Sequence, residues 1–257
     1  MQPEKYSFFK VELRDKIAFV TFNRPDRRNM WAKAEEWELD QLITDAITGD
    51  DVRVVVLTGA GETFSGGAHH SDDPFDAFDY FDRSCKLFGA FVDLDKPLVI
   101  ALNGPASGSG LTLAMLGDIV VAERHVRFSD AHVTGGVVSA TGPFLWPPSI
   151  GLLRAKRYLL TGDSFSADEA ERLGLVSEVV DTGMSLARAT EYAEHLASLP
   201  PAGVKGTKRA LNQWLRVAFA PVFEHALSLE FMMFPAAERN YGAGVVPSAP
   251  GASGGQA

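Results

Sequence analysis

The sequence has little cysteine and less positive than negative charge. Cys85 is the one cysteine among 257 residues, so no disulfide can form within the chain, and we expect a reducing, cytoplasmic compartment. Lysine and arginine number 24 against 33 acidic residues, a formal net charge of −9. Nucleic-acid binding is driven by basic side chains that neutralise phosphates. The charge therefore argues against nucleic acid as a partner.

Long apolar runs are also missing. No stretch approaches the roughly 18 apolar residues of a membrane span, and the N-terminal residues carry charges where a signal peptide has an apolar core. We therefore expect a soluble protein without a membrane partner. The composition, 46% hydrophobic and 22% charged, is that of an ordinary globular chain with a large core.

Short apolar runs bounded by turn residues predict strands in the first half of the chain. Those at 8–13 and 17–22 predict a hairpin, and four more predict buried strands: 52–57, 98–102, 119–122 and 126–129. Helical runs alternate with them, so the pattern predicts stacked strand–turn–helix units. In the first of these runs, five apolar residues are expected to share a buried face: Trp37, Leu39, Leu42, Ile43 and Ile47.

The second half of the chain has helical periodicity. Five runs predict helices, at 153–161, 167–173, 184–199, 206–217 and 222–239. The last sixteen residues contain only small, apolar and uncharged polar types, which is typical of a flexible tail. We therefore predict three regions: a core at 1–195, a helical region at 196–241 and a tail at 242–257.

Five stretches resemble, in order, the enoyl-CoA hydratase/isomerase (crotonase) family. They lie at 22–31, 54–70, 96–122, 126–136 and 154–180, within a resemblance that spans most of residues 8–240. The resemblance implies an α/β fold: a crotonase (ClpP-like) spiral of repeated β-β-α units with a helical C-terminal trimerisation region. It also implies a homotrimer or hexamer.

Two glycine-rich turns match the family's oxyanion hole, a pair of backbone N–H groups that hold an enolate oxygen. The turn at 64–68 resembles the first and assigns one donor to the N–H of Ala68. Gly108-Ser109-Gly110 resembles the second, at the start of a helix, and assigns the other donor to Gly110. One such donor is typically worth about 10²–10³ in rate.

The acid/base groups depart from the family. Its hydratases use two glutamates, and the matching positions here hold Thr112 and His132. A histidine can exchange a proton near neutral pH, whereas a threonine is a poor base. We therefore interpret His132 as the catalytic acid/base residue and Thr112 as a substrate-binding residue.

A histidine at this position resembles the β-diketone hydrolase branch typified by 6-oxocamphor hydrolase, which cleaves a C–C bond by a retro-Claisen step. Trp31 and Trp146 resemble tryptophans of that branch and are interpreted as substrate-binding. Thr141 stands nine residues after His132, where the branch has a supporting aspartate, and is assigned to the same set.

Further residues are candidates for ligand contact. Arg27 and Arg28 could meet the phosphates of CoA or could belong to a solvated turn. His69 and His70 could orient a substrate or relay a proton, and Phe75 could touch the substrate from a stretch that alternates acids with aromatics. We expect no metal and no cofactor, apart from CoA as part of the substrate.

Three functions remain open from the sequence. The first is an enzyme that acts on a CoA thioester, with lyase, isomerase or unusual hydratase chemistry. The second is a CoA-independent hydrolase of a cyclic β-diketone, in which His132 acts as the base for water. The third is a binding member that has lost catalysis, since Thr112 replaces an acid.

Overall fold

A six-stranded sheet forms the centre of the computed structural model, which describes residues 3–68 and 77–241. Its order is β1-β2-β3-β4-β5-β8; β1 and β2 are antiparallel, and every later pair is parallel. The strands span Phe9–Arg14 (β1), Ile17–Phe22 (β2), Val54–Gly59 (β3), Leu98–Leu102 (β4), Ile119–Glu123 (β5) and Glu178–Val180 (β8). The predicted hairpin and the buried strands of the sheet are confirmed.

A short second segment follows several of these strands and pairs outside the main sheet. Trp31, after β2, forms a parallel bridge with Ala68, and Ser65, after β3, forms one with Ala106. After β5, β6 (Arg127–Phe128) pairs with β7 (Phe165–Ser166) in a second, two-stranded sheet. Each turn of the chain thus contributes a long strand and a short one, which is the predicted β-β-α spiral.

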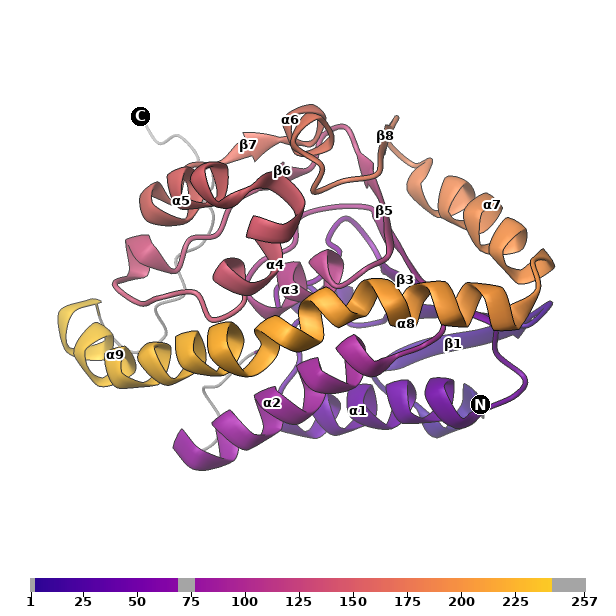
Figure 1. The fold of residues 1–257 in the computed structure, drawn as a ribbon, viewed down its shortest axis with the longest axis horizontal. Coiled ribbons are helices and arrows are strands. Elements are labelled where there is room, and N and C mark those ends of the chain that lie inside the picture. The colour runs from indigo at the N-terminus through magenta and orange to yellow at the C-terminus, as the bar shows by residue number, and fades with distance from the viewer. Residues whose placement is uncertain (1–2, 69–76, 242–257) are drawn as a thin grey trace.

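Helices cover the sheet and connect its strands (Figure 1). Their bounds are Lys33–Thr48 (α1), Ala77–Asp93 (α2), Ser109–Met115 (α3), Gly142–Ile150 (α4), Leu152–Thr161 (α5), Ala167–Leu173 (α6), Ser185–Ser198 (α7), Pro201–Ala218 (α8) and His225–Tyr241 (α9). A π-helical turn, Phe219–Glu224, joins α8 to α9, and the two run across the molecule as one bent rod (Figure 1). No helix in the described residues is long and apolar enough to cross a membrane.

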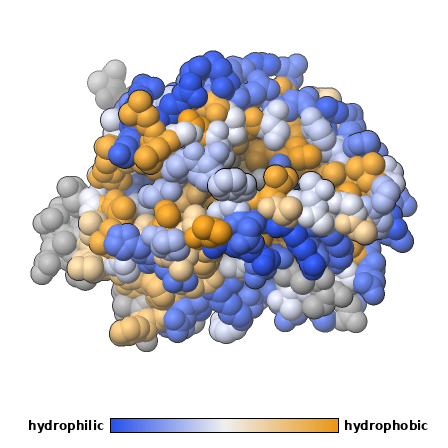
Figure 2. All heavy atoms as spheres, in the orientation of Figure 1, coloured by the Kyte–Doolittle hydropathy of each residue, from blue (hydrophilic) through white to orange (hydrophobic). Residues whose placement is uncertain are grey.

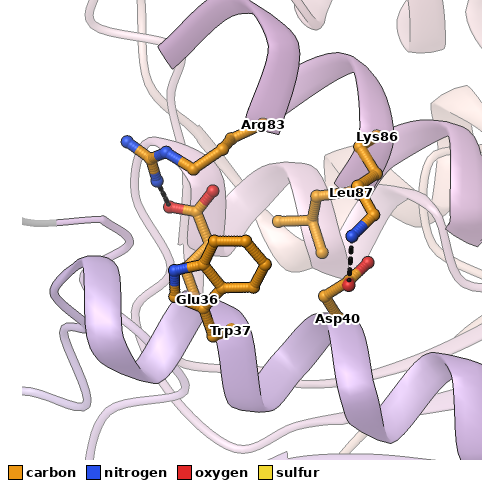
Figure 3. Close-up of a pocket in the computed structure, with 6 residues that line it drawn as sticks. All are labelled: Glu36, Trp37, Asp40, Arg83, Lys86 and Leu87. Carbon is orange, nitrogen blue, oxygen red and sulfur yellow. Dashed lines mark hydrogen bonds and ion pairs between the residues drawn. The ribbon is translucent and has the colours of Figure 1, made fainter. Parts of the chain in front are cut away.

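Helices α1 and α2 lie side by side and are held by ion pairs across a small hollow (Figure 3). Arg83 contacts Glu36 at 2.7 Å, and Lys86 contacts Asp40 at 2.8 Å. The ammonium of Lys86 also lies 5.3 Å from the ring centre of Trp37, which is 56% exposed. The expectation that Trp37 shares the buried face of its helix is therefore wrong, whereas three other members are buried: Leu39, Leu42 and Ile43.

The rod formed by α8 and α9 packs on the body through aromatic residues. Phe223 is buried, and its ring centre lies 5.6 Å from that of Phe88 on α2 and 5.8 Å from that of Phe144 on α4. Three large apolar side chains of α8 are exposed: Leu211, Trp214 and Val217. Figure 2 shows several hydrophobic patches on the face along which the rod lies.

Candidate active site

The two glycine-rich turns lie against each other, because β3 and β4 are parallel neighbours and their chains leave the sheet at the same edge. The N–H of Ser107 donates to the carbonyl of Ser65 at 3.1 Å, and the Ser107 hydroxyl donates to the carbonyl of Gly66 at 3.2 Å. A methyl group on Gly67 would lie 2.7 Å from the Ser107 carbonyl oxygen, and one on Gly110 would overlap the Ser65 carbonyl. Only glycine allows this approach.

The two predicted oxyanion donors differ in their hydrogen bonding. Ala68 follows Gly67, whose φ of +86° turns the chain, and no described residue accepts a hydrogen bond from the Ala68 N–H. The N–H of Gly110 instead donates to the carbonyl of Ser107 at 2.9 Å. Among the described residues, nothing accepts a hydrogen bond from the Ala68 N–H, whereas the Gly110 N–H is already bonded within its own turn.

His132 lies in the loop after β6 and is held by a carboxylate. Its Nδ1 is 2.5 Å from Oδ1 of Asp130, which is buried. The other oxygen of Asp130 accepts a hydrogen bond from Ser139 Oγ at 2.6 Å, and Ser139 Oγ accepts one from the Gly142 N–H at 3.0 Å. With Asp130 fixed from two sides, the ring of His132 has a defined orientation and Nε2 is the nitrogen left to act.

The charges around His132 raise its pKa. Burial alone would lower the pKa of His132, but the charge of Asp130, its hydrogen bond and the charge of Glu230 outweigh burial and raise the pKa to about 9. Burial likewise opposes ionisation of Asp130, yet His132 and Ser139 hold the pKa of Asp130 below its usual value. The raised pKa of His132 favours the imidazolium form of the ring near neutral pH.

The hydroxyl groups of Thr112 and Thr141 contact each other. Thr112, on the first turn of α3 after Gly110, has its Oγ1 2.8 Å from Oγ1 of Thr141. Thr141 precedes α4 as its N-cap and lies between Ser139, which holds Asp130, and the N-terminus of that helix. The hydroxyl of Thr112 is thus tied to the residue that precedes α4.

The carboxylate that supports His132 was not predicted from the sequence. The expected position, nine residues on, is Thr141, but the carboxylate belongs to Asp130, two residues before the histidine. The motif Asp130-Ala131-His132 was a signal available in the sequence. Ser139 and Glu230 gave no such signal.

The two tryptophans assigned to substrate binding are buried. Trp31 is 1% exposed and stacks on Phe22, with ring centres 5.7 Å apart. Its indole N–H has no hydrogen-bond acceptor in the described part of the chain, which leaves a donor for a ligand. Trp146 is 2% exposed and packs edge-on against Phe165. Their contact with a substrate stays a prediction, and three other candidates lie outside the described residues: His69, His70 and Phe75.

The two arginines assigned to CoA differ in their surroundings. Arg27 forms an ion pair with Glu35 and lies over the ring of Phe8. Arg28 is exposed and has no ion-pair partner among the described residues, and its carbonyl accepts a hydrogen bond from the N–H of Gly66 at 2.8 Å. The backbone of Arg28 thus contacts the first glycine-rich turn.

A spiral of β-β-α units that brings two glycine-rich turns together is the fold of crotonase-superfamily enzymes. The chain belongs to the enoyl-CoA hydratase/isomerase family, whose sequence model matches residues 12–242. The crystal structure of an enoyl-CoA hydratase/isomerase from Mycobacterium paratuberculosis is similar, with a TM-score of 0.81, 32% identity and coverage of 89% of this chain and 94% of that one.

Curated relatives differ in the reaction that their names give. A probable enoyl-CoA hydratase EchA12 of Mycobacterium tuberculosis is 37% identical over 218 residues, covering 80% of this chain and 76% of that protein. The 1,2-epoxyphenylacetyl-CoA isomerase of Escherichia coli is 33% identical over 205 residues, covering 76% and 78%. The family assignment therefore leaves the reaction of this chain open.

The close approach of the two turns predicts that Gly110→Ala destabilises the protein. Its methyl group would press on the Ser65 backbone, so we expect the free energy of unfolding to fall by about 1–3 kcal/mol. In the control Gly203→Ala, the new methyl group on α8 meets nothing within 4 Å and should stabilise by up to about 1 kcal/mol. Denaturant unfolding measures both, and a Gly110→Ala variant as stable as the wild type would contradict the described approach.

The Asp130 carboxylate predicts an alkaline titration of His132. We expect its imidazole NMR signals to titrate near pH 9, and Asp130→Asn to lower this pKa by about 1–3 units because the raising charge is removed. The matched control is Asp181→Asn, at a carboxylate that is 86% exposed, and it should leave His132 unchanged. An unaltered titration in Asp130→Asn would be evidence against the pairing.

Proposed function

We propose that the protein converts a CoA thioester through an enolate, by hydration or by a proton shift, with a histidine in place of the family's usual glutamate. The observation that carries this proposal is the fixed orientation of His132, whose Nδ1 is held by Asp130 while Asp130 is itself held by Ser139. The similarity to a probable enoyl-CoA hydratase and to a 1,2-epoxyphenylacetyl-CoA isomerase supports the substrate class.

In this mechanism the thioester oxygen lies at the two turns. Negative charge develops on that oxygen as the enolate forms, and the free N–H of Ala68 faces no competing acceptor among the described residues. The N–H of Gly110 contributes a bifurcated hydrogen bond, shared with the Ser107 carbonyl. Donors fixed before the reaction stabilise the enolate without reorganisation.

His132 acts in this mechanism as the acid. Its Nδ1 is engaged by Asp130, so the proton on Nε2 is the one that can pass to the enolate carbon. The raised pKa of His132, about 9, keeps that proton in place at neutral pH. Thr112 and Thr141 then supply hydroxyl groups to the substrate in place of a glutamate.

A second candidate is the CoA-independent hydrolysis of a cyclic β-diketone. The observation that favours it is the Asp130–His132 pair, because the branch resembled here also pairs its histidine with an aspartate. The ion pair between Arg27 and Glu35 also favours this candidate, because it engages one of the two arginines assigned to CoA.

A homotrimer or hexamer stays part of the proposal. Exposed apolar side chains follow one another at helical spacing on α8, at Leu211, Trp214 and Val217. Apolar surface of this kind is typical of interfaces between copies of a chain.

Arg28 and His132 provide the test of the CoA proposal. Calorimetry with acetyl-CoA should detect binding that Arg28→Ala weakens by about tenfold, a loss of about 1.4 kcal/mol for one phosphate contact. The control Arg154→Ala removes an exposed arginine of α5 and should bind as the wild type does. His132→Ala should lower kcat on a 2-enoyl-CoA by about 10²–10⁴.

Two outcomes would decide against this proposal. Absence of binding for any acyl-CoA at millimolar concentration would exclude a CoA thioester, and turnover of a cyclic 1,3-diketone that His132→Ala abolishes would then favour the second candidate. Full activity of His132→Ala on the enoyl-CoA would remove the histidine from the mechanism.

A further inference from the structure

The C-terminal helix carries a buried carboxylate to the histidine. Glu230 lies on α9 and is 5% exposed. Its Oε2 accepts a hydrogen bond from the N–H of Ala140 at 3.2 Å, which fixes the carboxylate beside the loop that precedes α4. Its Oε1 lies 3.9 Å from Nε2 of His132. A helix about a hundred residues further along the chain thus reaches the acid/base group.

Each ring nitrogen of His132 lies near a different carboxylate. Nδ1 of His132 is in hydrogen-bond contact with Asp130, whereas Nε2 faces Glu230 across 3.9 Å. That distance is too long for a hydrogen bond but short enough for strong charge interaction in a buried site. Nε2 and Oε1 therefore remain available to a substrate or to water while their charges act on each other.

We infer that Glu230 is the second acid–base group of the site, in which Oε1 takes up a proton while Nε2 of His132 delivers one. This inference rests on the proposed function. In a hydration, water adds its oxygen to the β-carbon and its released proton passes to Oε1. The Nε2 proton passes to the α-carbon of the enolate. Transfer of the proton from Oε1 to Nε2 then restores both groups, so the net reaction adds one water to the double bond.

The pKa values of Glu230 and His132 suit these roles. Burial raises the pKa of Glu230 to about 7, and Asp130 adds to this effect, while the charge of His132 and the Ala140 N–H oppose it. The pKa of His132 is about 9. Between these values Glu230 is a carboxylate and His132 an imidazolium, so one group can accept a proton and the other can give one.

Within residues 3–68 and 77–241, three titratable side chains interact with Glu230. His132 and Asp130 face it from the loop after β6, and Tyr80 faces it from α2, where the charge of Glu230 contributes to a pKa of Tyr80 well above the usual range. Helix α4 has no titratable residue in its sequence. Among the described groups, burial and the charge of His132 have the largest effects on the pKa of Glu230.

The test is the pH profile of kcat/KM on a 2-enoyl-CoA for the wild type and for Glu230→Gln. The wild-type profile should rise as Glu230 ionises near pH 7 and fall as His132 deprotonates near pH 9. Glu230→Gln retains an oxygen for the Ala140 N–H but cannot take up the proton, so we expect about a 10²-fold loss of kcat/KM and no acidic limb. The alkaline limb should move below pH 9, because the charge that raises the pKa of His132 is gone.

Glu194→Gln is the matched control, since Glu194 is an exposed glutamate of α7, and its profile should equal that of the wild type. A Glu230→Gln variant that keeps the limb near pH 7 overturns the inference. A merely structural role would lower activity at every pH without moving either limb, and that result overturns it too.

A measurement without substrate separates this inference from the proposed function. The imidazole NMR titration of His132 should shift down by about 1 unit in Glu230→Gln. If no acyl-CoA is turned over and this shift is observed, the proposed function fails while the coupling of His132 to Glu230 stands. An unshifted titration overturns the inference whatever the substrate is.

Discussion

The contact between the turn at Gly66–Gly67 and the turn at Ser107–Gly110 is the constraint on which the site depends. Parallel pairing of β3 with β4 directs both chains to one edge of the sheet, and two hydrogen bonds from Ser107 then tie the turns together. No side chain fits between them at Gly67 or Gly110. The same turns carry the predicted oxyanion donors, so the scaffold and the site share one set of backbone contacts.

Much of this arrangement follows from local sequence patterns. Glycine-rich turns after short apolar strands indicated where the chain turns at the sheet edge, and the family resemblance pointed to Thr112 and His132. Helix α4 escaped prediction because it contains Pro147 and Pro148, which normally end a helix. Trp37 was misjudged because apolar character does not distinguish a core residue from one covered by a lysine side chain.

The two carboxylates near His132 differ in whether they could be recognised from the sequence. Asp130 is two residues away and could have been recognised from the sequence alone. Glu230 could not: it binds the backbone of Ala140 across a separation of 90 residues, and nothing in the periodicity of its helix marks one glutamate for burial. Contacts of that length depend on how α8 and α9 pack on the body, which a single sequence does not reveal.

A histidine stands where the resemblance places a glutamate, and two buried carboxylates lie beside its ring. A buried imidazolium needs compensation, and Asp130 supplies it by direct contact at Nδ1. A second carboxylate at the same distance would tie up Nε2, whereas Glu230 at 3.9 Å adds charge without forming a hydrogen bond to that nitrogen. In the proposed mechanism the cation then offers a proton to an enolate whose oxygen has one free N–H donor at Ala68 and a shared one at Gly110. An acid with a full positive charge suits such a site better than a neutral one, because it stabilises the enolate before the proton moves.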